Sequence, residues 1–565
     1  MMQSVVRRYL CLLAAVFLLL TQLAVAQTSE RPGQLAVASA HELATEAGLE
    51  IMQAGGNAFD AAVAVSATLA VVEPASSGMG GGGFWLLHLA DEDRQLMVDG
   101  RETAPGEATA DMYLDEDGEV NRDLAINGPL AAGIPGQPAA LVHLAENYGR
   151  LPLAQTLAPA IRLAREGFEV DLKYQTLMQF RRSVVARYPA SAAIFLDEDG
   201  QVPAVGDLIV QADLADLLER LAEQGFDGFY RGELAEKLVA GVRADGGIWQ
   251  LDDLANYRVV ERDPIRFGYG DFSVVSASPP SAGGVVLAQI FNILSGYRLD
   301  LLSEDARIHL LAEAMRRAYR DRNLYLGDPD FVDMPLARLT SADYAAGLRA
   351  SIRLDRATES DALPGIESEP MGPNTTHFSV MDADGNAVAA TLSVNLPYGS
   401  GYMVEGTGLL LNNEMDDFSA RPGAPNAYGL IGDEANAIAP GKRMLSSMSP
   451  TIAFGPDSMA VLGSVGGSRI TTQVAQGLLA FFDGLPVSEW VSQGRYHHQY
   501  LPDEISHEPG ALSQETIEAL RERGHSVRNR MRSWGNMHAI HWHAEGVEAA
   551  SDPRWEIGHS EVRQP

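Results

Sequence analysis

The pattern that most restricts the fold of this chain is a pair of alternating stretches on either side of one tight turn. The segments "HFSVMD" and "AVAATLSVN" alternate in polarity, and "ADGN" between them places Asp384 and Gly385 at the centre of a turn. Two alternating runs around an Asp-Gly turn predict a β-hairpin with antiparallel strands. Because antiparallel pairing brings the start of one strand next to the end of the other, Thr375 should lie close to Ser393 and Asn395.

The two threonines in front of this hairpin, Thr375 and Thr376, allow two interpretations. They can be a solvated strand end, since threonine favours strands and the preceding Pro-Asn favours a turn. Alternatively, one of them is a nucleophile, which can use its own α-amino group as the base if the chain is cut before it. No His/Asp arrangement typical of a serine triad stands out, although His377 follows closely.

Three later segments supply polar groups that such a nucleophile would need. Acidic side chains occur in "LLLNNEMDDFS", and adjacent hydroxyls occur in "RMLSSMSPTI". The segment "GSVGGSRI" contains paired glycines whose backbone N–H groups can face an oxyanion. The residues concerned are Glu414, Asp416, Asp417, Ser446, Ser447, Gly466 and Gly467.

The first 26 residues have the features of an export signal. Two arginines precede an apolar run at 9–20, and "AVA" at 24–26 has the small-x-small pattern of a signal peptidase site. The apolar run is shorter than the ~20 residues that a membrane-spanning helix needs, so no membrane anchor is expected after signal removal. We therefore expect a periplasmic or secreted protein. The only cysteine, Cys11, lies in this segment, and the exported chain can form no disulfide.

Charge and composition narrow the class of protein further. Acidic residues outnumber basic ones by 75 to 42, giving a formal net charge of −33 at pH 7. Nucleic acid is not an expected partner, since phosphate binding needs clusters of lysine and arginine that are absent here. At 46% hydrophobic residues the chain can bury a large core. No low-complexity linker or repeat divides it, which leaves one large intertwined domain.

The glycine-rich segment "EPASSGMGGGGF" follows a predicted helix at 58–72 and precedes a predicted strand. Its glycines formally match the G-x-G-x-x-G pattern of dinucleotide sites, but that pattern requires a strand first and a helix after it. We interpret the glycines as a backbone passage too tight for any Cβ. After the strand, "MVDGRETAP" places Arg101 in a turn, which by itself predicts an exposed charge.

Taken together, these segments resemble the γ-glutamyltranspeptidase family of the N-terminal nucleophile hydrolase superfamily. The resemblance covers about residues 35–554, and it rests on "GGNAFDAAVAV", "GGGGF", "RETAP", "PPSAGG", "NTTHFSVMDADGNAVAATLS", "NNEMDDFS", "SSMSPTI", "GGSRI" and "ASDPR", in the family's order. It implies an α+β fold, a four-layer αββα sandwich made as one precursor that cuts itself between Asn374 and Thr375. The products would be a large subunit, 27–374, and a small subunit, 375–565, that stay together.

The resemblance also implies an acyl-enzyme mechanism on small γ-glutamyl amides such as glutathione. Water, amino acids or dipeptides would be the acceptors, and no metal or organic cofactor is implied. Thr375 would be the nucleophile of both self-cleavage and catalysis, and Gly466 and Gly467 would form the oxyanion hole. Ser393 departs from many relatives, which have threonine there, but it keeps a hydroxyl that can assist.

For the amino acid end of the donor, the resemblance implies a guanidinium and a carboxylate. Arg101 would bind the donor α-carboxylate and Asp417 the α-ammonium, which suits the charges of a zwitterion. The segment "PNAYGLIGDEANAIAPGKRM" matches the family's lid loop, with Tyr428 closing over the donor. Further donor contacts would come from Asn395, Glu414, Ser446 and Ser447.

Two competing functions remain open at this stage. A cephalosporin or glutaryl acylase of the same superfamily would have no need of an ammonium site at Asp417. A non-catalytic secreted binding protein would keep the fold but stay one intact chain after export.

Two further motifs concern metal binding and glycosylation. In "HAIHWH", His538, His541 and His543 crowd together, and His541 and His543 would share one face of a strand. No carboxylate motif or third anchored ligand accompanies this pair in the sequence, which favours a structural role. The glycosylation sequon that begins at Asn374 is formal, since a sugar there would block the chemistry proposed for Thr375.

Overall fold

The predicted hairpin lies at the centre of a large sheet. Strands β9 (Thr376–Met381) and β10 (Ala387–Ser393) pair antiparallel, and Thr376 lies opposite Leu392. The Asp-Gly turn joins them, and Gly385 adopts a φ of +94°, which glycine tolerates without strain. The hairpin prediction is confirmed.

The computed structural model describes residues 31–363, 375–421 and 423–565. The predicted signal peptide with the only cysteine, at 1–26, and the predicted cut after Asn374 therefore lie outside the described residues. Within the part of the chain that is described, no helix combines the length and the apolar character needed to cross a membrane.

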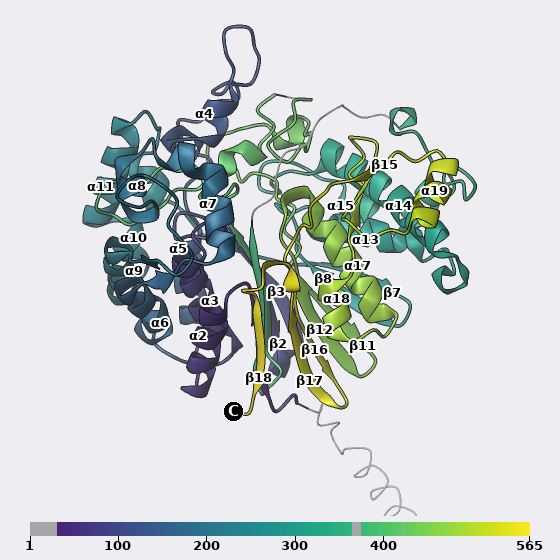
Figure 1. Cartoon of the computed structure of the whole chain (residues 1–565), viewed down its shortest axis with the longest axis horizontal. Helices are drawn as coiled ribbons and strands as arrows, with labels where there is room; N and C mark the ends of the chain where they lie inside the picture. Colours follow the sequence, from purple (N-terminus) through teal and green to yellow (C-terminus); the bar gives the residue numbers. More distant parts are fainter. Residues whose placement is uncertain (1–30, 364–374, 422) are drawn as a thin grey trace, which may run out of the picture.

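Two antiparallel sheets lie face to face (Figure 1). The first has the strand order β18-β1-β9-β10-β2-β3-β6 and the second has the order β17-β16-β12-β11-β8-β7. Each sheet contains strands from both sides of Thr375, so the two predicted subunits would share both sheets. Besides β9 and β10, the strands are β1 (Leu35–Ser39), β2 (Gly82–Leu89), β3 (Arg94–Gly100), β6 (Val260–Arg262), β7 (Ile265–Tyr269), β8 (Phe272–Ser276), β11 (Thr451–Gly455), β12 (Ser458–Gly463), β16 (His538–His543), β17 (Gly546–Ser551) and β18 (His559–Arg563).

Helices cover the outer face of each sheet and complete the predicted four-layer αββα arrangement (Figure 1). The layer over the first sheet contains α2 (Glu42–Gln53), α3 (Ala58–Val72), α5 (Gln137–Asn147), α6 (Leu153–Glu166), α7 (Leu172–Val185), α8 (Pro189–Phe195), α9 (Ala212–Gln224), α10 (Phe226–Tyr230) and α11 (Gly232–Ala244). The layer over the second sheet contains α13 (Gly283–Leu294), α14 (Glu304–Tyr325), α15 (Leu336–Leu339), α16 (Ala342–Arg349), α17 (Ile470–Phe482), α18 (Val487–Ser492) and α19 (Gln514–Glu522). Shorter elements are α4 (Arg122–Ile126), α12 (Leu251–Ala255), β4 (Phe168–Glu169), β5 (Leu208–Ile209), β13 (Tyr496–His497), β14 (Ile505–His507) and β15 (Val527–Asn529).

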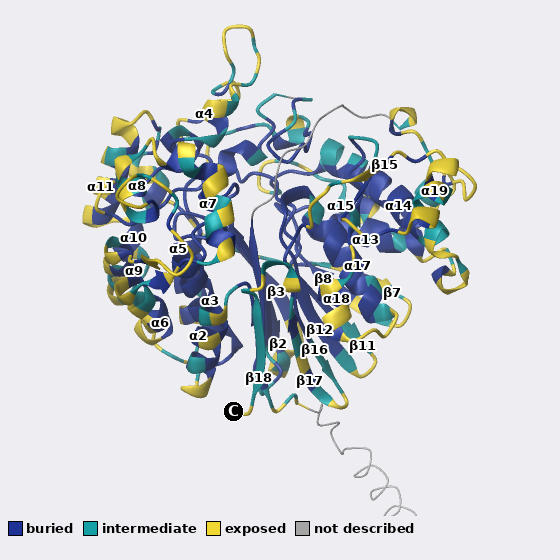
Figure 2. Ribbon diagram, viewed as in Figure 1, coloured by how far each residue is buried: buried dark blue, intermediate teal, exposed yellow. Residues whose placement is uncertain are grey.

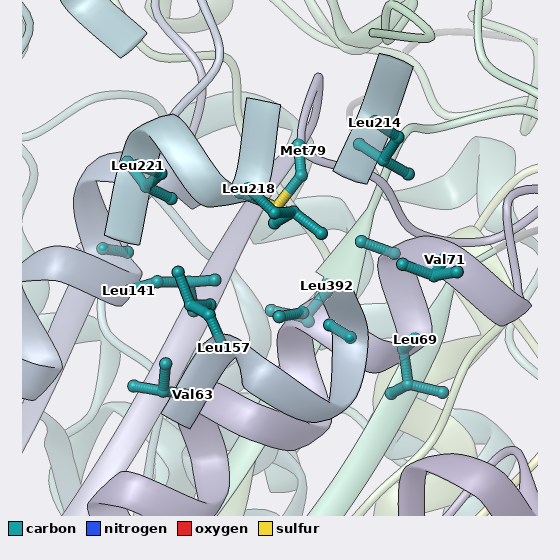
Figure 3. Close-up of a cluster of buried hydrophobic side chains, with 14 of the residues drawn as sticks. Val63, Leu69, Val71, Met79, Leu141, Leu157, Leu214, Leu218, Leu221 and Leu392 are labelled. Carbon is teal, nitrogen blue, oxygen red and sulfur yellow. The ribbon is translucent and has the colours of Figure 1, made fainter. Parts of the chain in front are cut away.

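Helix α3 shows why the chain folds this way. All 15 of its residues are buried, because its mostly small apolar side chains let the first sheet and the neighbouring helices approach closely. Burial is concentrated in the sheets and the inner helix faces, while exposed residues lie on the outer helices (Figure 2). Figure 3 shows Val63, Leu69 and Val71 of α3 in the same cluster as Leu392 of β10. Since Leu392 directly precedes Ser393, this core fixes the strand end that carries a predicted site residue.

Candidate active site

The residues predicted for the site converge on one small cavity of about 20 Å³. Ten of the eleven line it, and Gly466 is the exception. Leu430, Met448 and Ile470 supply apolar parts of the wall. The ten residues are Arg101, Thr375, Ser393, Asn395, Glu414, Asp417, Tyr428, Ser446, Ser447 and Gly467.

Thr375 directly precedes β9 and is only 4% exposed. Continuing the β9–β10 register by one residue places it opposite Ser393. Beyond that point the chain turns away, because Asn395 adopts a φ of +72° and donates its N–H to Ser393 Oγ at 2.7 Å. Immediately before the neighbouring strand β2, a Cβ on Gly81 would overlap the carbonyl oxygen of Ser393. The glycine run is therefore the tight backbone passage that was predicted, and it allows β10 to end where it does.

A buried ion pair holds the strand behind Thr375. Thr376 donates its hydroxyl hydrogen to Glu73 Oε2 at 2.6 Å, and Glu73 Oε1 contacts the ammonium group of Lys173. Glu73 and Lys173 are each 4% exposed and come from the end of α3 and the first turn of α7. Sequence reasoning did not single out this pair, because its members meet only when the two helices pack.

Arg101 is 1% exposed, so the expectation of an exposed turn residue was wrong. It follows β3 directly, and its guanidinium lies 2.7 Å from Glu414 Oε2 and 2.6 Å from Asp417 Oδ2. Its Nε also donates to the Met444 carbonyl oxygen at 3.3 Å. Burial alone would lower the pKa of Arg101, but the two carboxylates outweigh it and raise that pKa above its ordinary value. The guanidinium is thus a fixed positive charge in the wall of the cavity.

Two buried carboxyl groups beside Arg101 have raised pKa values. Burial raises the pKa of Glu414 to about 7, against the opposing charge of Arg101. Burial and the nearby Glu414 raise the pKa of Glu102 well above its ordinary range. Glu102 lies 3.8 Å from the Arg101 guanidinium, and within the described residues neither of its carboxyl oxygens has a hydrogen-bond partner. Glu414 therefore titrates near pH 7.

Tyr428 covers one side of the cavity. Its ring packs on Gly467, where a Cβ would overlap the ring, and its hydroxyl donates to the Asn395 carbonyl oxygen at 2.8 Å. Asn426 Oδ1 accepts a hydrogen bond from the backbone N–H of Tyr428 at 2.9 Å. Asn426 Nδ2 donates to Asp417 Oδ1 at 3.1 Å. Asn426, which the sequence did not single out, therefore joins the predicted lid to the carboxylate that the lid would cover.

A second buried guanidinium stands behind the adjacent serines. Arg322 of α14 is 4% exposed, and its Nη2 donates to Ser447 Oγ at 3.4 Å. Burial lowers the pKa of Arg322 to about 10, so it remains a cation at neutral pH. The backbone N–H of Ser446 donates to the Pro280 carbonyl oxygen at 2.8 Å, which fixes the serine pair. Sequence reasoning missed Arg322 because "MRRAYRDRNLY" is typical of an exposed helix.

The paired glycines begin a helix that points at the cavity. Gly466 and Gly467 have φ angles of +121° and +57°, which explains why both are glycine. One 3₁₀ turn, Gly467–Arg469, leads into α17, and both Gly467 and Ile470 line the cavity. The start of a helix favours negative charge, which suits an oxyanion. Gly466 does not line the cavity, and the role of its N–H remains a prediction.

His377 is not part of the site, although it lies two residues from Thr375. It is fully buried, and its Nδ1 is 2.9 Å from Thr391 Oγ1. Burial lowers the pKa of His377 well below its ordinary value, so the ring is neutral. No histidine occurs among the described residues that line the cavity. The α-amino group of a chain that begins at Thr375 therefore remains the candidate base.

The sequence profile of the Gamma-glutamyltranspeptidase family matches residues 44–561. This chain belongs to the γ-glutamyltranspeptidase family. The matched region includes every residue that lines the cavity, and it confirms the predicted family. The chain is thus an enzyme with the fold of the N-terminal nucleophile hydrolases.

Individual relatives agree with this assignment. The glutathione hydrolase proenzyme of Pseudomonas sp. (strain A14) is 45% identical over 498 residues, covering 86% of this chain and 85% of that protein. The glutathione hydrolase proenzyme of Escherichia coli (strain K12) is 42% identical over 532 residues, covering 93% and 91%. The crystal structure of cephalosporin acylase from Bacillus halodurans superposes with a TM-score of 0.82 at 29% identity, covering 94% of this chain and 95% of that one. The names of the first two relatives support synthesis as a precursor that is processed into two subunits.

Proposed function

We propose that this enzyme cleaves γ-glutamyl amides, glutathione among them, and transfers the γ-glutamyl group to water, an amino acid or a dipeptide. The observation that carries the proposal is the cavity in which Thr375 lies with a buried guanidinium and two carboxyl groups. The amino acid end of such a donor carries a carboxylate and an ammonium on one carbon atom. Arg101 suits the carboxylate, and Asp417 with Glu414 suits the ammonium. The relatives named glutathione hydrolase support the same donor.

Self-cleavage would prepare the nucleophile. The Thr375 hydroxyl oxygen attacks the carbonyl carbon of Asn374, and the peptide C–N bond breaks as an ester forms. Water then hydrolyses the ester, leaving a carboxylate on Asn374 and a free α-amino group on Thr375. The large subunit, 27–374, and the small subunit, 375–565, would stay associated without a covalent bond, because both contribute strands to both sheets.

Catalysis would then repeat the same attack on the donor. The α-amino group, with a reference pKa of about 7.7–8.0, takes the hydroxyl proton as Thr375 Oγ attacks the γ-carbonyl carbon. The N–H groups of Gly466 and Gly467 stabilise the oxyanion, and its collapse expels the amine, which receives that proton. Water or an acceptor amine attacks the resulting γ-glutamyl ester and regenerates Thr375. Ser393, opposite Thr375, would orient the hydroxyl by hydrogen bonding, and none of these steps uses a metal or an organic cofactor.

The remaining cavity residues would fix the donor. The hydroxyl groups of Ser446 and Ser447 would donate to its carboxylate, with Arg322 behind Ser447 adding positive charge. Asn395 would contact the ammonium beside Asp417, and Tyr428 would cover the bound γ-glutamyl group. Excluding water in this way strengthens each charged contact.

Donor affinity is expected to weaken as the pH falls through about 7, because Glu414 gains a proton there and loses its attraction for the donor ammonium. In Glu414→Gln the side chain is neutral at every pH. Its KM at pH 8 should therefore be on the order of 3- to 30-fold higher than that of the wild type, and its KM should change less between pH 6 and 8. KM is measured with a γ-glutamyl anilide at each pH. Parallel KM–pH profiles for the wild type and Glu414→Gln would show that Glu414 does not contribute to donor binding.

Two polypeptides, 27–374 and 375–565, are expected on a denaturing gel of the exported protein, with Thr375 as the first residue of the smaller one. We propose that the protein is periplasmic or secreted, so cell fractionation should place both polypeptides outside the cytoplasm. The same sample should release aniline from a γ-glutamyl anilide, and faster when a dipeptide acceptor is added. A folded protein that stays in one piece and releases none would support the non-catalytic binding protein instead.

An acylase is the second candidate function, because the cephalosporin acylase of Bacillus halodurans shares this fold over nearly its whole length. An acylase acting on glutaryl side chains has no ammonium to bind. The carboxylates of Asp417 and Glu414 beside Arg101 therefore favour the γ-glutamyl donor.

A further inference from the structure

The hairpin formed by β16 and β17 carries a cluster of two histidines and a glutamate away from the active site. His541 and His543 lie on the same face of β16, as two residues two positions apart in a strand do. Glu548 of β17 lies directly opposite His541 in the strand register. One ligand atom from each of the three residues falls within 4.8 Å of the other two. None of them lines the cavity that contains Thr375.

The imidazole rings of His541 and His543 lie close together, with an angle of 40° between their planes. Nδ1 of His543 accepts the backbone N–H of Glu545 at 3.3 Å, while its Nε2 lies 4.0 Å from Glu548 Oε2. The ring of His541 packs against Trp490, with 5.0 Å between ring centroids, and lies 4.6 Å from the ring of His543.

We propose that His541, His543 and Glu548 bind one divalent transition-metal ion, with zinc as the expected ion. Two imidazoles and one carboxylate form a set that zinc takes in open sites, where water or another small ligand fills the fourth position. With bonds of about 2.0–2.2 Å, tetrahedral ligand atoms lie roughly 3.3–3.5 Å apart. The 4.0 Å separation between His543 and Glu548 therefore needs only a small rotation of an exposed side chain.

Other histidine clusters of the described residues do not have ligand atoms available to a metal ion in this way. His538 begins the same strand but is fully buried, and it is not within ligand distance of the pair. In the buried group around α14, His309 Nδ1 is already hydrogen-bonded to His525 Nε2 at 2.7 Å. The carboxylate of that group, Glu313, forms an ion pair with Arg317 at 2.6 Å. Its ligand atoms are thus committed to protein partners, whereas those of the hairpin group face solvent in part.

The position of the site indicates what the ion would do. Strand β17 is the edge strand of the second sheet, and it also contacts β18 and β1 of the first. An ion shared between β16 and β17 would tie the edge strand to its neighbour. Because a ligand that binds only the folded state stabilises it, we expect zinc to raise the unfolding temperature and to leave turnover unchanged.

The test uses the untagged protein with both of its subunits, after a chelator has removed bound metal. Calorimetric titration with zinc should show one ion per molecule, and cobalt should give the visible absorption of a tetrahedral site. His543→Ala and Glu548→Gln should each weaken zinc binding at least 10-fold and abolish the zinc-dependent rise in unfolding temperature. A matched control is His143→Ala, since His143 is a partly exposed histidine that lies 2.9 Å from Glu261 but belongs to no group of three possible metal ligands among the described residues.

His143→Ala should bind zinc as the wild type does, and all three variants should turn over a γ-glutamyl anilide at the wild-type rate. Wild-type protein that binds no zinc at 100-fold excess over protein would overturn the proposal. So would equal zinc affinity in His543→Ala and the wild type, which would mean that the ion binds elsewhere. Weak binding of several ions with no effect on unfolding would show adventitious surface binding only.

Discussion

Thr375→Ala is expected to remain one polypeptide and to lose turnover of γ-glutamyl anilide by on the order of 10⁴-fold or more, because both reactions need the same hydroxyl oxygen. Thr375→Ser keeps that oxygen without the methyl group that orients it, so it should still split slowly and retain measurable activity. A denaturing gel followed over time gives the splitting rate, and steady-state kinetics give the turnover. Circular dichroism of Thr375→Ala should match the wild type.

The neighbouring threonine supplies the control. Thr376→Ser keeps the hydrogen bond to Glu73 and changes the same methyl group one position away, so it should split and turn over within a few-fold of the wild type. When 27–374 and 375–565 are produced as separate chains, no self-cleavage is needed. Thr375→Ala in the second chain then measures the loss of catalysis apart from the loss of splitting. If Thr375→Ala still divides at the same bond, the nucleophile is another residue.

Local features of the fold could be predicted from the sequence because they are encoded within a few residues. The Asp-Gly turn between two alternating runs sets the hairpin, and the hairpin alone places Thr375 near Ser393. The all-round apolar character of α3 predicts a buried helix for the same reason. The glycine run could be interpreted as a close passage, but which backbone it passes, the carbonyl of Ser393, depends on the folded sheet.

The charged part of the site could not be predicted in this way. Arg101 follows a strand in a polar segment, which is typical of an exposed residue, and it is buried only because Glu414 and Asp417 arrive from more than 300 positions away. Arg322 reaches Ser447 from 125 positions away, and Asn426 reaches Asp417 from 9 positions away. Family resemblance supplied Arg101, Glu414 and Asp417 as donor contacts, but their direct ion pairs and the raised pKa of Glu414 come from the structure.

The charges of the cavity suit a zwitterion better than an anion. Arg101 is paired with Asp417 and Glu414, and breaking such a buried pair without replacing both partners is costly, at about 3–5 kcal/mol. A donor that brings both a carboxylate and an ammonium supplies a new partner to Arg101 and a new partner to the carboxylates of Asp417 and Glu414. A donor that brings only a carboxylate satisfies Arg101 and leaves Asp417 desolvated and unpaired.

A γ-glutamyl anilide is therefore expected to react far faster than a glutaryl anilide, which lacks only the amine. An unpaired buried charge typically costs about 2–5 kcal/mol, which corresponds to roughly 30- to several-thousand-fold in kcat/KM.

Asp417→Asn should narrow the difference in kcat/KM between the two anilides, mainly by slowing the γ-glutamyl donor. Arg101→Lys should slow both donors, because an ammonium cannot reproduce the two-pronged guanidinium contact. Asp416→Asn is the matched control, since Asp416 is the buried carboxylate next to Asp417 but accepts the Ala427 N–H and does not line the cavity, so the selectivity of this variant should equal that of the wild type. Equal kcat/KM for the two anilides in the wild type would reject Asp417 as the ammonium site and favour the acylase.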